Sequence, residues 1–168
     1  RIPIAQVYTE TIIPLLKDAK DMIYKNSDNG FKPGRVCAAT AAGLLAKVYA
    51  TIGSASMATG EQITVKTGAP FVMQNVNGTM TNTEPVPTTF SKDQVAGYES
   101  FSSQEYYRLA YEIAGDIIGG EYGIHKLEDY DLVWSPSGKT CSEHLFSLQT
   151  KSGDELYGTL FSSHYCGR

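Results

Sequence analysis

Residues 5–25 carry apolar side chains at the three- and four-residue spacing of an amphipathic helix. The apolar positions are Tyr8, Ile12, Leu15, Leu16, Ala19, Met22 and Ile23. The polar positions between them are Lys17, Asp18, Lys20 and Asp21. Pro14 interrupts the pattern because it removes a backbone donor, so the sequence predicts either a kink there or a helix that starts near Thr11.

A second helix is predicted over 35–52, with two unlike faces. Its apolar stripe consists of Leu44, Leu45, Val48, Tyr49 and Ile52. Its small side chains are Ala38, Ala39, Ala41, Ala42, Gly43 and Ala46. Small side chains let another backbone approach closely, as in stacked helical hairpins. The pattern indicates a packing scaffold, and the helix is expected to stop at Gly53.

A third helix is predicted over 102–118. It begins with the capping pair Ser102 and Glu105, three residues apart. It ends at Gly119 and Gly120, since glycine commonly terminates helices. The predicted buried stripe consists of Tyr107, Ala110, Tyr111, Ala114, Ile117 and Ile118.

Between the second and third helices, residues 57–99 are rich in Thr, Gly, Asn, Pro and Val. A structureless loop of this length is unusual inside a compact domain. Alternation over 62–66 and 71–73 predicts short strands, so the segment is interpreted as an insertion between scaffold helices that contains a hairpin. Near the other end of the chain, residues 144–150 alternate apolar and polar, which predicts a half-buried strand.

The composition limits the classes of protein to consider. The chain has 168 residues, 42% of them hydrophobic and 19% charged, with a net charge of −4. That length suffices for one domain with a core. An acidic chain without a basic stripe argues against a nucleic-acid partner. Because the chain opens almost at once into a helix, we interpret 1–168 as a single partial domain of a longer protein.

The motifs of phosphate-binding loops and of zinc proteases are missing from the sequence. The histidines are dispersed at His125, His144 and His164. The cysteines, Cys37, Cys141 and Cys166, include no CxxC pair, and whether Cys141 pairs with Cys166 stays open. The sequence therefore predicts no catalytic residue, no metal and no cofactor.

An acidic cluster, Glu128, Asp129 and Asp131, lies beside two aromatic residues. A solvated turn is the interpretation that such a cluster favours. Paired carboxylates of a glycoside hydrolase are the alternative, because that chemistry needs two carboxyl groups across the scissile bond.

Aromatic residues in predicted loops are the better indication of function, since tyrosine occurs 11 times. An aromatic ring at the surface can stack on a sugar face while its polar end stays hydrated. The candidate ligand-binding residues are Trp134, Tyr130 and Tyr98. The alternative for each ring is that it only fixes a loop to the scaffold.

Four blocks of the sequence, in order, resemble the SusD/RagB family. The first pairs Gly34-Arg35-Val36 with Leu44-Leu45-Ala46-Lys47-Val48-Tyr49, and the second runs from Tyr107 through Gly119-Gly120 to Tyr122-Gly123-Ile124. The third is 130–134, and the fourth is Glu143-His144-Leu145-Phe146-Ser147-Leu148-Gln149. Pro33 before Gly34, and Pro14 in the first helix, depart from the family pattern.

The resemblance implies a mostly α fold of tetratricopeptide-like helical hairpins, here with an irregular insertion that contains short strands. It implies a lipoprotein at the cell surface of the outer membrane, attached only through a lipid anchor outside this chain. Such proteins bind nutrients, often oligosaccharides, and deliver them to a SusC-like TonB-dependent transporter. They are not enzymes, so the resemblance implies that this protein is not one. The two alternatives are a helical-repeat interaction module without a ligand site and a glycoside hydrolase fragment.

Overall fold

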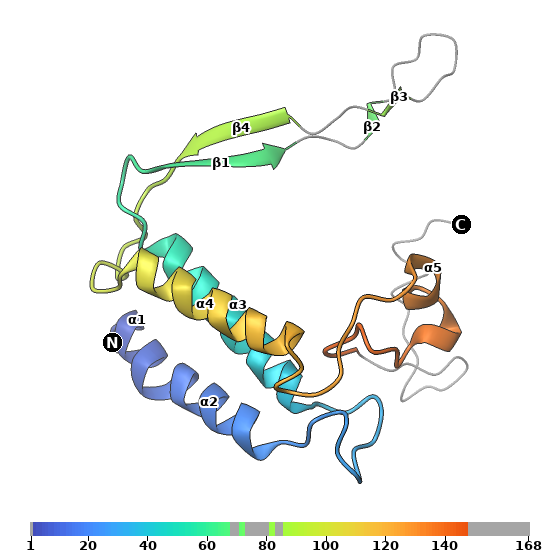
Figure 1. Cartoon of the computed structure of the whole chain (residues 1–168). Helices are drawn as coiled ribbons and strands as arrows, with labels where there is room; N and C mark the ends of the chain where they lie inside the picture. The colour runs from blue at the N-terminus through green and yellow to red at the C-terminus, as the bar shows by residue number, and fades with distance from the viewer. Residues whose placement is uncertain (1, 68–70, 73–80, 83–85, 148–168) are drawn as a thin grey trace, which may run out of the picture.

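A computed structural model describes residues 2–67, 71–72, 81–82 and 86–147. The fold is mostly helical, as the sequence predicted. Figure 1 shows α2, α3 and α4 side by side, a β-hairpin projecting from one end of the α3–α4 pair, and the segment that carries α5 at the opposite end. We call residues 119–147 the C-terminal lobe.

The first helical rod passes through Pro14 without a break. It consists of α1 (Ile4–Val7), the π-helical turn η1 (Tyr8–Ile12) and α2 (Ile13–Met22). Within the turn, the Ile13 N–H donates to the carbonyl of Tyr8, five residues earlier. Pro14 cannot donate to Glu10, and the wider turn accommodates this missing bond. The predicted start near Thr11 is therefore wrong, because the rod begins at Ile4.

The buried face of this rod differs from the predicted stripe. Leu15 is 62% exposed and Met22 is 84% exposed. Two members of the predicted stripe, Tyr8 and Leu16, do pack against the core, together with Ile13, which was not predicted. Apolar doublets such as Leu15–Leu16 occupy two neighbouring rows of the helix surface, so periodicity does not tell which row turns inward.

Helix α3 (Ala38–Ala55) is the centre of the fold. The predicted stop at Gly53 is wrong, because the helix continues to Ala55. Gly53 is buried, and a Cβ there would lie 3.1 Å from the ring of Tyr107 on α4. This glycine makes room for a neighbouring side chain inside the helix. At the other end, the Thr40 hydroxyl accepts from the Cys37 N–H at 3.1 Å and caps the first turn.

The small residues of α3 allow close packing, as predicted. Ala38, Ala39 and Ala42 are fully buried in a cluster with Cys37 and Tyr122. A second cluster contains Leu45, Tyr49 and Ile52, against which α2 and α4 pack. The segments 35–52 and 104–118, which the sequence predicted to pack as helices, do lie in contact.

Helix α4 (Ser103–Ile118) has nearly the predicted bounds. The Ser102 hydroxyl accepts from the Glu105 N–H at 3.3 Å, and Gly119 follows the last turn. Of its predicted buried stripe, Ala110 and Ile117 do pack on the core, but Tyr111 is 81% exposed and Ile118 is 82% exposed, so those two assignments are wrong. The residues that pack on the core are Tyr106, Leu109, Ala110, Ile113 and Ile117.

A β-hairpin separates α3 from α4. Strand β1 (Gln62–Thr67) pairs antiparallel with β4 (Val86–Ser91), and β2 (Phe71–Val72) pairs with β3 (Thr81–Asn82). The strands predicted over 62–66 and 71–73 are thus found, with residue 73 outside the described residues. A backbone bond from the Lys92 N–H to the Glu61 carbonyl closes the base of the hairpin, and one from the Val95 N–H to the Ala55 carbonyl joins the following segment to α3.

The C-terminal lobe contains two short helical turns, α5 (Tyr130–Val133) and η2 (Pro136–Gly138). Of the strand predicted over 144–150, residues 144–147 are irregular and 148–150 lie outside the described residues. The carbonyl of Leu145 accepts from the Thr40 hydroxyl on α3, where a strand would need a backbone partner. The open question of whether Cys141 pairs with Cys166 lies outside the described residues, because Cys166 is not among them.

Candidate ligand-binding site

Two aromatic rings lie at the surface of the C-terminal lobe, as predicted for loop aromatics. Tyr130 is 76% exposed and Trp134 is 74% exposed. Their ring centroids are 6.3 Å apart at an interplanar angle of 57°. The short helix α5 causes this proximity, because residues four apart lie on one side of a helix. Asp129 caps α5 by accepting from the Asp131 N–H at 3.0 Å.

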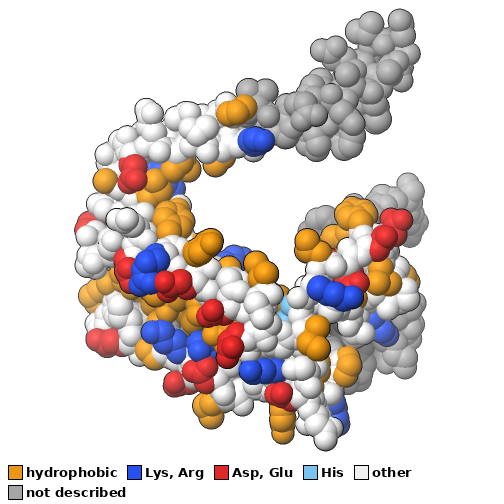
Figure 2. Space-filling view, in the orientation of Figure 1, with side chains coloured by type: hydrophobic (Ala, Val, Ile, Leu, Met, Phe, Trp, Pro, Cys, Tyr) orange, Lys and Arg blue, Asp and Glu red, His pale blue; other side chains and the backbone are white. Residues whose placement is uncertain are grey.

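Beside Trp134 an open groove of about 550 Å³ runs between α3 and the lobe. Its lining residues are Thr40, Gly43, Leu44, Lys47, Val133, Trp134, Glu143, His144, Leu145 and Phe146. Leu44 and Phe146 are each about half exposed. Figure 2 shows hydrophobic side chains gathered on this part of the surface around α5. The groove is therefore mostly apolar.

Gly43 lets the lobe approach α3 closely at the floor of this groove. A Cβ at Gly43 would lie 2.8 Å from Cδ1 of Leu145. The carbonyl of the same leucine accepts from Thr40, three residues earlier on α3. Both contacts fix residues 144–146, which form the boundary between the groove and a second pocket.

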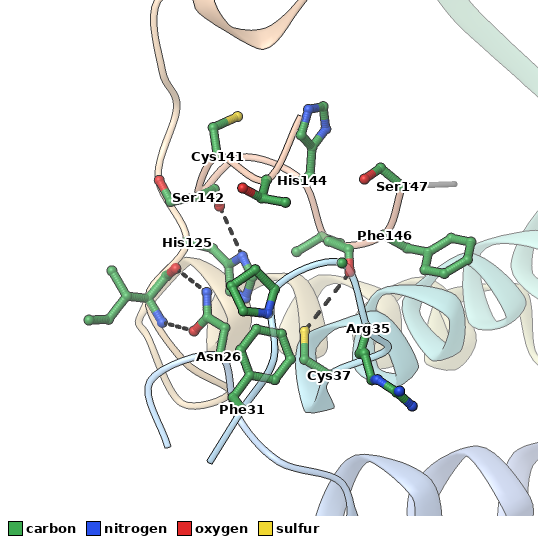
Figure 3. A pocket seen from close by; sticks show the side chains of 15 residues that line it. Asn26, Phe31, Arg35, Cys37, His125, Cys141, Ser142, His144, Phe146 and Ser147 are labelled. Carbon is green, nitrogen blue, oxygen red and sulfur yellow. Dashed lines mark hydrogen bonds between the residues drawn. The ribbon is translucent and has the colours of Figure 1, made fainter. Parts of the chain in front are cut away.

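That second pocket, of about 260 Å³, lies between the 26–37 connector and the lobe. Figure 3 shows its residues, among them Asn26, Phe31, Cys37, His125 and His144. The Asn26 amide donates to the Ile124 carbonyl and accepts from the Ile124 N–H, both at 2.7 Å. These two bonds fasten the lobe to the connector.

Gly123 is required at this junction. Its φ of 120° lies in the region that favours glycine. A Cβ at Gly123 would also lie 2.2 Å from the Oδ1 of Asn26. The backbone therefore reaches the Asn26 side chain only because no side chain is present at residue 123.

His125 is held by its ring nitrogen Nδ1, which lies 3.0 Å from the Ser142 carbonyl. Since a carbonyl only accepts, Nδ1 carries the hydrogen. The other nitrogen, Nε2, is buried and has no partner within the described residues. Cys37 and Cys141 also line this pocket, yet the part of the chain that the structure describes contains no group of three His, Cys, Asp or Glu residues placed to hold a metal.

The acidic cluster has structural contacts. The Glu128 carboxylate accepts from the Ser142 hydroxyl at 2.5 Å, and this bond, with Lys126 nearby, lowers the pKa of Glu128. The Glu143 carboxylate accepts from the Glu128 N–H at 2.9 Å. These bonds, with the Asp129 cap, hold the lobe together.

Tyr98, the third predicted ligand residue, lies in the core. It is 7% exposed and its ring packs against Tyr8 and Phe101. Its hydroxyl donates to the hydroxyl of Tyr8 at 3.2 Å. Burial and this bond raise the pKa of Tyr98 to about 12. Its position in a predicted loop suggested an accessible ring, and that expectation is wrong.

Of the residues that line the groove, sequence reasoning found only Trp134 and missed the others, among them Leu44, Lys47 and Phe146. Leu44 was placed in the buried stripe of its helix, but only Leu45 of the pair turns fully inward. Phe146 belonged to a predicted strand. The signal that could have found Leu44 is the apolar doublet itself, since one of two adjacent residues on a helix usually faces away from a single partner.

Comparison of the chain with protein-family models, with curated proteins and with solved structures gives no match in any of the three. The SusD/RagB resemblance therefore stays a prediction. Within the described residues, none of the helices has the length and hydropathy needed to cross a bilayer.

Proposed function

We propose that this protein captures a nutrient, most simply an oligosaccharide, at the cell surface and delivers it to a SusC-like TonB-dependent transporter. The observation that carries the proposal is the exposed pair of rings, Tyr130 and Trp134, beside an open groove. Aromatic rings present flat apolar faces that suit the C–H face of a sugar. The proposal includes tetratricopeptide-like hairpins for the helices and a lipid anchor outside this chain.

The groove supports a particular mode of binding. Trp134 supplies the ring and lies with Leu44 and Phe146 along the apolar wall. Lys47 and His144 supply polar groups that can bond sugar hydroxyls. Most of the affinity comes from the ring that loses water on contact, as in other binding sites with a few dominant residues.

The test is binding to a panel of soluble polysaccharides in a native affinity gel, followed by calorimetry on those that retard the protein. Trp134→Ala should weaken binding about 30-fold, which corresponds to roughly 2 kcal/mol for a dominant aromatic contact. Tyr111→Ala is the matched control, because it removes another ring, 81% exposed, from α4. Retardation of the wild type that survives Trp134→Ala would refute the role of this site.

One observation favours a second function, docking of a partner protein. Tyr111 and Ile118 on α4 are each more than four-fifths exposed, although neither lies in the groove. Two results together would identify an interaction module. The wild type would not be retarded by any glycan, and its binding to a partner protein would be lost in a Tyr111→Ser and Ile118→Ser double variant. Release of reducing sugar, lost in Asp129→Asn or Asp131→Asn, would instead support the hydrolase alternative.

A further inference from the structure

The connector between α2 and α3 forms a small surface of its own, at the end of α2 in Figure 1. We call the group Tyr24, Lys25, Lys32, Arg35 and Val36 the connector surface. The Ala38 N–H donates to the Tyr24 carbonyl at 2.9 Å and holds the two ends of the connector together. A groove of about 390 Å³ results, lined by Tyr24, Gly30, Phe31, Lys32, Arg35 and Val36.

The connector surface exposes large apolar side chains. Tyr24 is 61% exposed and Val36 is 47% exposed, and both line the same groove. Met22, two residues before Tyr24, is 84% exposed. Single exposed apolar residues are ordinary, but a group of them at one place marks an interaction site.

The same surface carries an excess of positive charge, although the chain as a whole has a net charge of −4. Within the described residues, none of its three cations forms an ion pair. The only carboxylate inside the connector, Asp28, accepts from the Lys25 N–H at 2.7 Å. The nearest carboxylate on α2, Asp21, pairs with Lys20 at 2.6 Å. The connector thus contains three cationic side chains and one carboxylate.

The connector is anchored to the scaffold. Phe31 turns inward and packs against the alanine cluster of α3, while Asn26 bonds to both backbone groups of Ile124. The exposed side chains are therefore presented from a fixed backbone, which lowers the ordering cost of binding.

We propose that the connector surface binds an anionic lipid membrane. Apolar and aromatic side chains enter the headgroup boundary of a bilayer, and flanking Lys and Arg side chains contact its anionic phosphates. The long stems of Lys32 and Arg35 suit this boundary, because they keep the charge in water while the methylene groups are buried. The contact would be additional to the proposed lipid anchor, so it departs from the expectation that the anchor is the only attachment to the membrane. It does not depend on the glycan proposal.

A soluble polyanion or a phosphorylated peptide could also bind this surface, but it would depend on different residues. It would use Lys32 and Arg35 but would gain little from Tyr24 or Val36. The apolar half of the surface therefore favours the membrane, and the experiment must test the two halves separately.

The experiment measures co-sedimentation of the chain with phosphatidylcholine vesicles, with and without phosphatidylglycerol, at low ionic strength. The wild type should bind only the vesicles that contain phosphatidylglycerol. Lys32→Glu removes one positive charge and adds one negative charge, so the local charge changes by two units. At about 1 kcal/mol for each unit of charge near the membrane surface, partitioning into the vesicles should weaken about 30-fold. Tyr24→Ser should weaken it several-fold by removing buried apolar area.

Matched controls carry the same chemical changes elsewhere on the molecule. Lys66→Glu alters an exposed lysine on β1, and Tyr111→Ser alters an exposed tyrosine on α4. Both should bind as the wild type does. The proposal is overturned if the wild type does not bind the anionic vesicles, or if Lys66→Glu weakens binding as much as Lys32→Glu. Binding that needs Lys32 but is unchanged in Tyr24→Ser would also overturn it and would indicate a polyanion site.

Discussion

The helical scaffold and the C-terminal lobe are held together by different kinds of interaction. In the scaffold, Leu45, Ile52 and three alanines of α3 are completely buried against α2, α4 and the loops beside them. In the described lobe, 119–147, only Tyr122, Gly123 and Gly138 are buried. Tyr122 packs in the alanine cluster, and hydrogen bonds from the side chains of Asn26 and Thr40 to lobe carbonyls add to this contact. Within the lobe, the Glu143 carboxylate accepts from the Glu128 N–H.

This difference explains why the candidate site lies on the lobe. A side chain that supplies hydrophobic packing is buried and cannot contact a ligand. Because polar bonds fix the lobe, Tyr130 and Trp134 are left at the surface. The scaffold shows the opposite case in Tyr98, whose ring stabilises the core and is closed to ligand.

The largest effect is expected from a pair of adjacent leucines in the scaffold. Leu45→Ala should lower the free energy of unfolding by about 2–5 kcal/mol, because it leaves a cavity in a fully buried site. Leu44→Ala, at a residue 51% exposed, should change it by less than about 1 kcal/mol. Denaturant unfolding of both variants measures the difference. Equal effects would contradict the assignment of the buried face.

The lobe should open locally when its polar connection is removed. Asn26→Ala deletes two hydrogen bonds to Ile124 and should destabilise the lobe by about 1–3 kcal/mol. Hydrogen exchange of the amides in 124–147 should accelerate, while amides of α3 keep their protection. Asn29→Ala, at an exposed residue of the same connector, is a control with the same substitution. Uniform acceleration across α3 and the lobe would show that the two regions unfold as one unit.

A smaller effect is expected from alkaline pH on the ring cluster. The pKa of Tyr98 rises from 10.0 to about 12 on folding, through burial and the bond to Tyr8. Because the folded state favours the neutral phenol, the raised pKa of Tyr98 adds to the free energy of unfolding at pH values below 10. This contribution is lost as the pH rises from 10 through about 12. Urea midpoints measured across that window should fall in the wild type and fall less in Tyr98→Phe.

Tyr111→Phe is the control for this titration, because Tyr111 is 81% exposed. Its midpoints should follow the wild type. Burial also raises the pKa of Tyr49 and of Tyr106, so some alkaline loss should persist in Tyr98→Phe. A pH dependence that is identical in Tyr98→Phe and the wild type would contradict the assignment.

Much of the fold could be predicted, but the site only in part. Helical periodicity, the Ser102 cap and Gly119 predicted α4 to within a residue. The exposure of Tyr130 and Trp134 agreed with their place near acidic and turn-forming residues. The groove beside them could not be predicted, because it is formed by α3 and by 143–146, which are about 100 residues apart in the sequence.

The sequence by itself determined where the main helices lie, because caps, glycines and apolar spacing act over a few residues. Only the tertiary structure decided which apolar row of each helix is buried, since doublets such as Leu44–Leu45 offer two rows of similar hydrophobicity. It also decided that Tyr98 is a core residue and Trp134 a surface residue. Burial depends on contacts between distant segments, and local sequence does not encode which segments meet.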